Sequence, residues 1–145
     1  MTLNIVKLCV GCDSIEDLIA WREEVATERK ARGLPMEMSH TTRMVPKRGD
    51  ELLDGGSLYW VIKGNVQCRQ KLLHIRLVTG SDGISRCQLV MDPTVVPTQW
   101  QPRRPFQGWR YLLAKEAPAD LKEGQLSMLE MPRALREELA SLGLL

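Results

Sequence analysis

Arginine and aromatic side chains are concentrated between Pro102 and Tyr111, where together they could bind phosphates and flat rings. The segment holds three arginines and three aromatic rings among ten residues. A core segment is rich in aliphatic residues and poor in unpaired guanidinium groups, so ordinary packing does not explain this composition. Arginines beside aromatic rings are typical of surfaces that recognise phosphates, nucleic acids or protein partners. We therefore expect a binding surface here.

The basic and aromatic character extends beyond this segment. Residues 63–110 carry eight basic and two acidic side chains, whereas residues 1–62 and 111–145 each carry a net charge of −2. Six of the seven aromatic residues lie between Tyr59 and Tyr111. This distribution is typical of a site for an anionic ligand, with RNA or a nucleotide the expected partner. The residues expected to bind it are Arg43, Lys47, Arg48, Trp60, Lys63, Arg69, Gln70, Arg103, Arg104, Phe106, Trp109 and Arg110.

The same residues have a structural alternative. Because the chain has few aromatic rings, some of Trp60, Phe106 and Trp109 must serve the core. The arginines could then pair with carboxylates from the acidic ends of the chain. The sequence leaves both interpretations open, and the arginines support a binding role more safely than the rings.

Cys9-Val10-Gly11-Cys12 is a CxxC motif, which in some proteins binds zinc or exchanges disulfides. Zinc needs two further ligands, and the remaining cysteines and histidines are isolated along the chain. A redox CxxC follows a strand and opens a helix, as this one does, but the thioredoxin-like βαβ continuation is missing. We therefore expect reduced structural thiols, with Cys9 in a core strand and Cys12 just before a helix cap.

No nucleophile elbow, phosphate-binding loop or dinucleotide fingerprint is present. His40 and His74 fall on predicted strands, where a structural role is the default. The acidic residues Asp50, Glu51 and Asp54 could hold a cation, but a solvated helix face explains them equally well. The sequence thus predicts no catalytic residue, metal or cofactor. Three classes remain open: a nucleic-acid or nucleotide binder, an enzyme acting on a small nucleotide-like substrate, and a protein-interaction module.

The elements that must position these residues form one α+β domain of 145 residues. Helices are expected from Asp13 or Ser14 to Gly33, over 47–53 and from Pro132 onwards. Strands are expected over 3–10, 38–45, 57–63, from 66 to a turn at 80–83, and over 84–91 and 109–113. The prolines between residues 95 and 108 predict an irregular connection there. We expect a small, mainly antiparallel sheet or barrel with an early helix and a C-terminal helix.

Neither a membrane span nor a secretion signal is predicted. The longest apolar run, Leu58 to Ile62, is far too short to cross a bilayer. Lys7 interrupts the apolar start of the chain, and no basic region precedes it. We therefore expect a cytoplasmic protein of undetermined oligomeric state.

Several blocks resemble a known family. They are Gly55 to Gly64, Arg69-Gln70, Pro102 to Leu112, Lys7 to Gly11 and Ser14 to Leu18. Through them the chain resembles, over nearly its whole length, the bacterial family called domain of unknown function 1489. The resemblance implies a small cytosolic single-domain protein without an assigned activity. A looser similarity in layout, at Lys7, the Ser14–Leu18 helix start and the Tyr59-Trp60 strand, is to PUA-like (EVE and ASCH) domains. It implies a small barrel around a site for RNA or a modified base.

Overall fold

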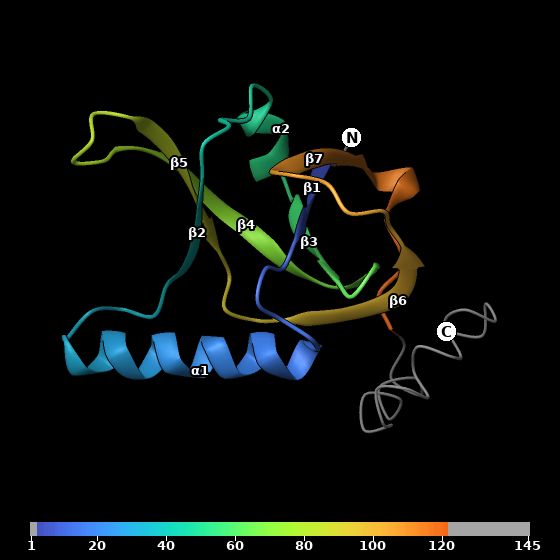
Figure 1. The fold of residues 1–145 in the computed structure, drawn as a ribbon, viewed down its shortest axis with the longest axis horizontal. Helices are drawn as coiled ribbons and strands as arrows, with labels where there is room; N and C mark the ends of the chain where they lie inside the picture. The colour runs from blue at the N-terminus through green and yellow to red at the C-terminus, as the bar shows by residue number, and fades with distance from the viewer. Residues whose placement is uncertain (1–2, 122–145) are drawn as a thin grey trace.

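The computed structural model describes residues 3–121, which fold as α+β as predicted. The expected helix from Pro132 onwards lies outside the described residues. In chain order the elements are β1 (Leu3–Leu8), α1 (Ile15–Ala31), β2 (Met38–Thr42), α2 (Gly49–Leu53), β3 (Ser57–Ile62), β4 (Asn65–Thr79), β5 (Ser85–Met91), β6 (Val96–Pro102) and β7 (Trp109–Leu113), followed by a short 3-10 helix (Ala114–Glu116) (Figure 1).

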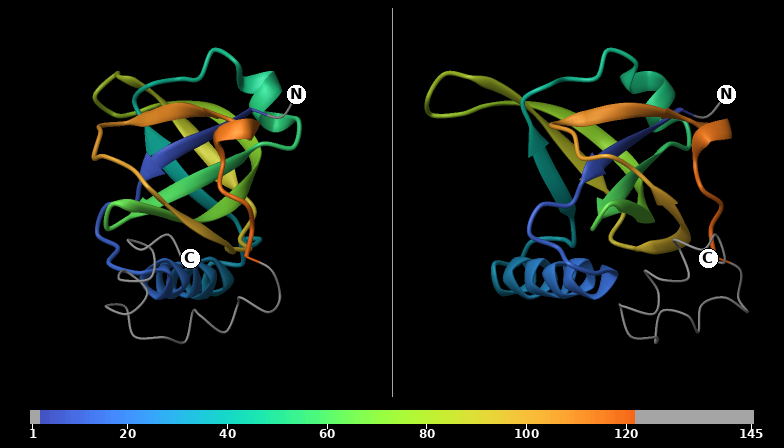
Figure 2. Two further views of the ribbon diagram at one scale, coloured as in Figure 1. Left: turned by 90° about the vertical axis from the view of Figure 1, so that its right-hand side faces the viewer. Right: turned by 45° about the vertical axis from the view of Figure 1, so that its right-hand side comes forward.

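The seven strands form one curved, mainly antiparallel sheet in the order β2-β5-β4-β3-β1-β7, with β6 also paired to β4 (Figure 2). Strand β4 is long enough to serve two parts of the sheet. Its first half pairs with β3 and β6, and its second half pairs with β5. Strands β1 and β3 are parallel, and β7 pairs antiparallel with β1. The main core thus lies against the inner face of the curved sheet.

Helix α1 begins and ends at the predicted signals. The Ser14 hydroxyl accepts a hydrogen bond of 3.4 Å from the Asp17 amide, and the Asp17 carboxylate accepts one of 2.8 Å from the Asp13 amide. After the last turn, Gly33 has a φ of +70° and the Leu34 amide donates to the Arg29 carbonyl at 2.8 Å. The helix lies across one end of the curved sheet (Figures 1 and 2).

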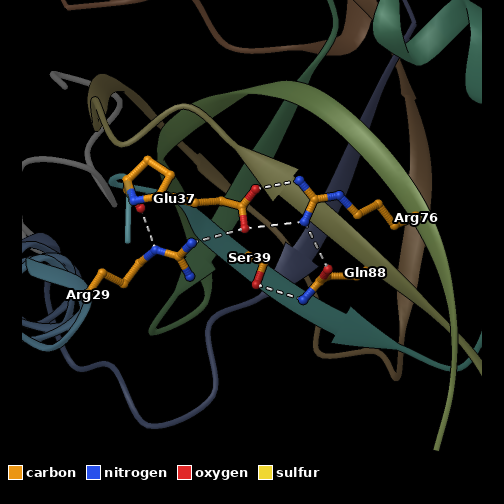
Figure 3. A network of polar contacts seen from close by, with 6 residues as sticks. Arg29, Glu37, Ser39, Arg76 and Gln88 are labelled. Carbon is orange, nitrogen blue, oxygen red and sulfur yellow. Dashed lines mark hydrogen bonds and ion pairs between the residues drawn. The ribbon is translucent and has the colours of Figure 1, made fainter. Parts of the chain in front are cut away.

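A charged network fastens the C-terminal end of α1 to the sheet (Figure 3). Glu37, just before β2, lies between Arg29 of α1 and Arg76 of β4. On the same sheet face Gln88 donates a hydrogen bond of 3.2 Å to the Ser39 hydroxyl. The hydrogen bond from Arg76 is the main reason that the pKa of Glu37 lies below its ordinary value. This network fixes the position of α1 relative to β2.

Two turns in the sheet follow the sequence signals. Lys63 and Gly64, with φ values of +50° and +80°, connect β3 to β4 in a two-residue hairpin of the primed type. The predicted turn at residues 80–83 joins β4 to β5, and the Asp82 carboxylate there accepts a hydrogen bond from the Ile84 amide. The hairpin formed by β4 and β5 extends away from the rest of the sheet (Figure 1).

The expectation of an irregular connection over residues 95–108 is wrong in its first half, where β6 forms. This strand contains Pro97 and ends at Pro102. Among the described strands it pairs with β4, and on its other side Thr98 forms an isolated bridge with Asp120. An edge strand tolerates proline because one row of its amides needs no partner in the sheet. The second half, residues 103–108, is irregular as expected and leads into β7. No helix within residues 3–121 is both long and apolar enough to cross a membrane.

Candidate functional site

Three of the predicted binding residues belong to the core, which corrects the expectation that they form an exposed surface. Gln70 is fully buried, and its side chain accepts a hydrogen bond of 2.9 Å from the Trp60 indole. Trp109 is 3% exposed and donates from its indole nitrogen to the Met44 carbonyl at 2.8 Å. Trp60 is 2% exposed. Their polar groups are satisfied internally, as buried polar groups generally are.

Three of the predicted cations are held in ion pairs, as the structural alternative requires. Their pairs are Arg48 with Glu51, Lys63 with Asp13, and Arg69 with Asp120. Arg69 binds both carboxylate oxygens of Asp120, at 2.8 and 2.7 Å. These hydrogen bonds are the main reason that the pKa of Asp120 is lowered. Glu51, one of the acidic residues considered as a possible cation site, is therefore paired with Arg48.

The remaining five predicted cations have no carboxylate partner within residues 3–121. They are Arg43, Lys47, Arg103, Arg104 and Arg110. Arg110 lies over the half-buried ring of Phe106, with 5.3 Å between the guanidinium carbon and the ring centroid, and it donates to the Gln107 carbonyl. These side chains can therefore still bind an external anion.

The Arg69–Asp120 pair forms part of the wall of an open polar hollow of about 360 Å³. Its wall includes Ser57, whose hydroxyl accepts a hydrogen bond of 3.0 Å from Arg69, and the hydroxyl-bearing ring of Tyr59. Asp120 already neutralises Arg69, the only cation that residues 3–121 contribute to the wall, so this hollow is the poorer candidate for an anionic ligand.

A more enclosed and mainly apolar pocket of about 300 Å³ lies between the end of β1, α1, β2 and β3. We call it the indole pocket, because the rings of Trp21 and Trp60 form part of its wall. His40 meets Trp60 edge to face, with ring centroids 5.7 Å apart and an interplanar angle of 84°. The complete lining is Cys9, Val10, Gly11, Cys12, Asp17, Trp21, His40 and Trp60.

Burial shifts the pKa values of His40 and Cys9, two polar residues that line the indole pocket. Burial, helped by the charge of Lys7, lowers the pKa of His40 to about 4, so the imidazole is neutral at pH 7. Lys7 is itself buried in β1, and burial lowers the pKa of its amine. Burial also raises the pKa of the Cys9 thiol, and a hydrogen bond with the Cys12 side chain adds to this effect. The pocket thus combines a neutral imidazole, two thiols and the Asp17 carboxylate with aromatic walls.

Two of the predicted cationic positions are linked indirectly to this pocket through Asp13, a residue beside it. Asp13, next to the pocket residue Cys12, pairs with Lys63 at 3.0 Å. The Arg103 amide donates to the carbonyl of Gly64, the neighbour of Lys63, at 2.8 Å. The start of the irregular segment therefore contacts the Lys63–Gly64 turn, whose lysine pairs with Asp13 beside the pocket.

Sequence reasoning did not find this pocket. The sequence predicts a structural role for both histidines; His40 lines the pocket, whereas His74 is exposed on β4 and lines none of the pockets described. Trp21 was placed on the apolar face of α1 without a functional role. One signal was available, because Lys7 is the single charged residue of a mostly apolar strand and stands two residues before the CxxC motif. Among the described residues, no group of three or more histidines, cysteines and acidic residues is placed to hold a metal ion.

Comparison with known proteins identifies a family for this chain but assigns it no activity. No curated protein and no solved structure matches the chain significantly, so the similarity in layout to PUA-like domains stays a prediction. One family model, described as protein of unknown function (DUF1489), matches residues 5–145. Since the match covers nearly the whole sequence, the chain belongs to the DUF1489 family.

Proposed function

We propose that this protein is a cytoplasmic binding module for single-stranded RNA that holds one base in the indole pocket and phosphates on neighbouring arginines. The observation that carries the proposal is the pocket itself, in which the partly exposed rings of Trp21 and His40 offer aromatic surfaces to a flat ligand, with the buried Trp60 completing the wall. Stacking of a base on an aromatic side chain is worth about 1–3 kcal/mol. The pocket volume of about 300 Å³ accommodates a single heterocycle.

The polar groups in the pocket suit the edge of a base. The Asp17 carboxylate can accept hydrogen bonds from exocyclic amino or ring N–H groups, and the neutral His40 imidazole can donate one hydrogen bond and accept another. Donors and acceptors that a bound ligand covers confer specificity, since a ligand that leaves them unpaired loses affinity.

Phosphates would bind outside the pocket. Arg103 and Arg104 follow β6, next to the Lys63–Gly64 turn whose lysine contacts the pocket rim through Asp13. On the other side, Arg43 stands three residues beyond His40, about 10 Å along an extended chain. These arginines have no carboxylate partner within residues 3–121, so binding a phosphate breaks no ion pair in this part of the chain.

The test is the binding of labelled single-stranded RNA at about 50 and 200 mM salt, measured by fluorescence anisotropy. We expect an Arg103→Ala/Arg104→Ala variant to bind about tenfold more weakly at low salt and to lower the slope of log affinity against log salt by about 1–2. A matched control, Lys30→Ala/Arg32→Ala at the far end of α1, makes the same change in net charge and should bind like the parent.

The base pocket is tested separately with Trp21→Leu, whose fold is checked by circular dichroism. It should weaken RNA binding by a factor of about 5–100 at both salt concentrations while leaving the salt slope unchanged. Full affinity in this variant would exclude the pocket as the base site. Failure of the parent protein to bind any RNA, or equal binding by the arginine variant and its control, would overturn the proposal.

A further inference from the structure

We propose that Cys9 and Cys12 form a redox-active dithiol that exchanges with low-molecular-mass disulfides and closes to an intramolecular disulfide in the wall of the indole pocket. The proposal does not depend on RNA binding, since it concerns the two thiols alone. Sequence reasoning treated both cysteines as structural. The structure places both residues in the pocket wall, half-buried, with the Cys12 amide donating a hydrogen bond to the Cys9 carbonyl.

The backbone between the two cysteines has the shape that a short disulfide loop requires. The Cys12 amide donates to the Cys9 carbonyl at 3.4 Å, which closes a four-residue turn, and Gly11 adopts a φ of +85° within it. Such a turn brings its end residues within about 7 Å between Cα atoms, and disulfides span about 4.4–6.8 Å. The two sulfur atoms can therefore join without rearrangement of β1 or α1.

The surroundings favour this pair over the other two cysteines. Cys68 and Cys87 are fully buried in the core, so a small disulfide cannot reach them in the folded protein. Cys9 and Cys12 are each partly accessible through the pocket. All four cysteines are free thiols in this structure, but a small disulfide can reach only the two of the CxxC pair.

Exchange would proceed in two balanced steps. The Cys12 sulfur, as thiolate, attacks one sulfur of a small disulfide such as oxidised glutathione, forming a mixed disulfide and releasing one thiolate. The Cys9 thiol then loses its proton to solvent and attacks the Cys12 sulfur, releasing the second small thiol. Two protein thiols are oxidised by two electrons and the small disulfide is reduced to two thiols. Because burial raises the pKa of Cys9, we assign the first attack to Cys12.

Oxidation would change the pocket chemically as well as sterically. Both S–H groups disappear as hydrogen-bond donors, and the turn containing Val10 and Gly11 is fixed by a covalent bond. A ligand that uses either thiol would therefore discriminate between the two redox states.

The test equilibrates the full chain with mixtures of reduced and oxidised glutathione, alkylates the remaining thiols and maps tryptic peptides by mass spectrometry. Trypsin places both motif cysteines in the single peptide from Leu8 to Arg22, whereas Cys68 and Cys87 fall in two other peptides. We expect the Leu8–Arg22 peptide to lose two hydrogens and both alkylation sites as the mixture becomes oxidising. Cys68 and Cys87 should be alkylated only after denaturation.

Single variants assign the order of attack. Cys9→Ser should accumulate glutathione on Cys12, whereas Cys12→Ser should react at Cys9 about tenfold more slowly or not at all. Persistent alkylation of both motif cysteines in a strongly oxidising mixture would overturn the proposal. So would a bridge that joins the Leu8–Arg22 peptide to the peptide containing Cys68, or to a second copy of itself.

Discussion

The indole nitrogen of Trp60 donates a hydrogen bond of 2.9 Å to Oε1 of Gln70, its diagonal neighbour across strands β3 and β4. The amide nitrogen of Gln70 in turn donates to the Asp92 carbonyl at 3.0 Å and contacts the Met38 sulfur at 3.3 Å. One buried amide thus connects β3 and β2 to the end of β5. It also fixes the orientation of the ring that forms a wall of the indole pocket.

Replacing Gln70 with alanine should destabilise the fold by about 2–4 kcal/mol, because the Trp60 indole and the Asp92 carbonyl would both lose buried partners. Urea unfolding monitored by fluorescence measures the change in the free energy of unfolding. Gln107→Ala is the matched control, since Gln107 is exposed and its replacement should cost no more than about 0.5 kcal/mol. Equal midpoints for the two variants would show that the buried network contributes nothing to stability.

Gly56→Ala should prevent folding or destabilise the chain by about 3 kcal/mol or more. A Cβ atom at this position would come within 3.0 Å of the backbone carbonyl oxygens of Leu3 and Leu52, neither of which can move without disturbing β1 or α2. Gly49→Ala is the comparison, because its Cβ would make an ordinary 3.5 Å contact with Ile75. Thermal unfolding of both variants checks the expectation, which is wrong if they melt together.

His40 should remain neutral until the pH falls to about 4. Burial lowers its pKa from the ordinary 6.5, and the charge of Lys7 contributes less. Because the unfolded chain binds the proton more readily than the folded chain, His40 makes stability fall as the pH drops from 6.5 towards 4. NMR titration of the imidazole signals gives the pKa directly, with His74→Asn to assign them. A midpoint near 6.5 would contradict the burial of His40.

Local signals in the sequence were sufficient for most of the fold. The cap at Ser14, the stop at Gly33 and the turn at 80–83 all lie where the sequence predicts them, because each depends on neighbouring residues alone. Strand β6 was missed because proline argues against a strand unless one knows that the strand lies at an edge. The parallel pairing of β1 with β3 likewise depends on contacts between distant parts of the chain.

The candidate site was harder to predict because its residues come from four separate elements. Cys9 directly follows β1, whereas Trp21 belongs to α1, His40 to β2 and Trp60 to β3. No local sequence motif contains more than one of these elements. The residue types alone also failed to separate core from surface. Trp109 and Phe106 stand three residues apart, yet only Trp109 reaches the main core, because residue 109 begins β7 while residue 106 lies in the preceding loop.

Tyr111→Phe should loosen the segment from Arg43 to Arg48 without unfolding the protein. The Tyr111 hydroxyl accepts a hydrogen bond of 3.1 Å from the Arg48 amide. The Trp109–Met44 hydrogen bond and the contact of the Arg48 guanidinium with the ring of residue 111, at 5.7 Å, remain as attachments of this segment to β7. Loss of one exposed hydrogen bond should cost no more than about 1 kcal/mol globally, while local opening becomes more frequent. Trypsin should therefore cut after Arg43, Lys47 or Arg48 several-fold faster, as followed by mass spectrometry. Tyr59→Phe removes a hydroxyl elsewhere and should leave the cleavage rate unchanged; acceleration by both variants would show that the effect is global.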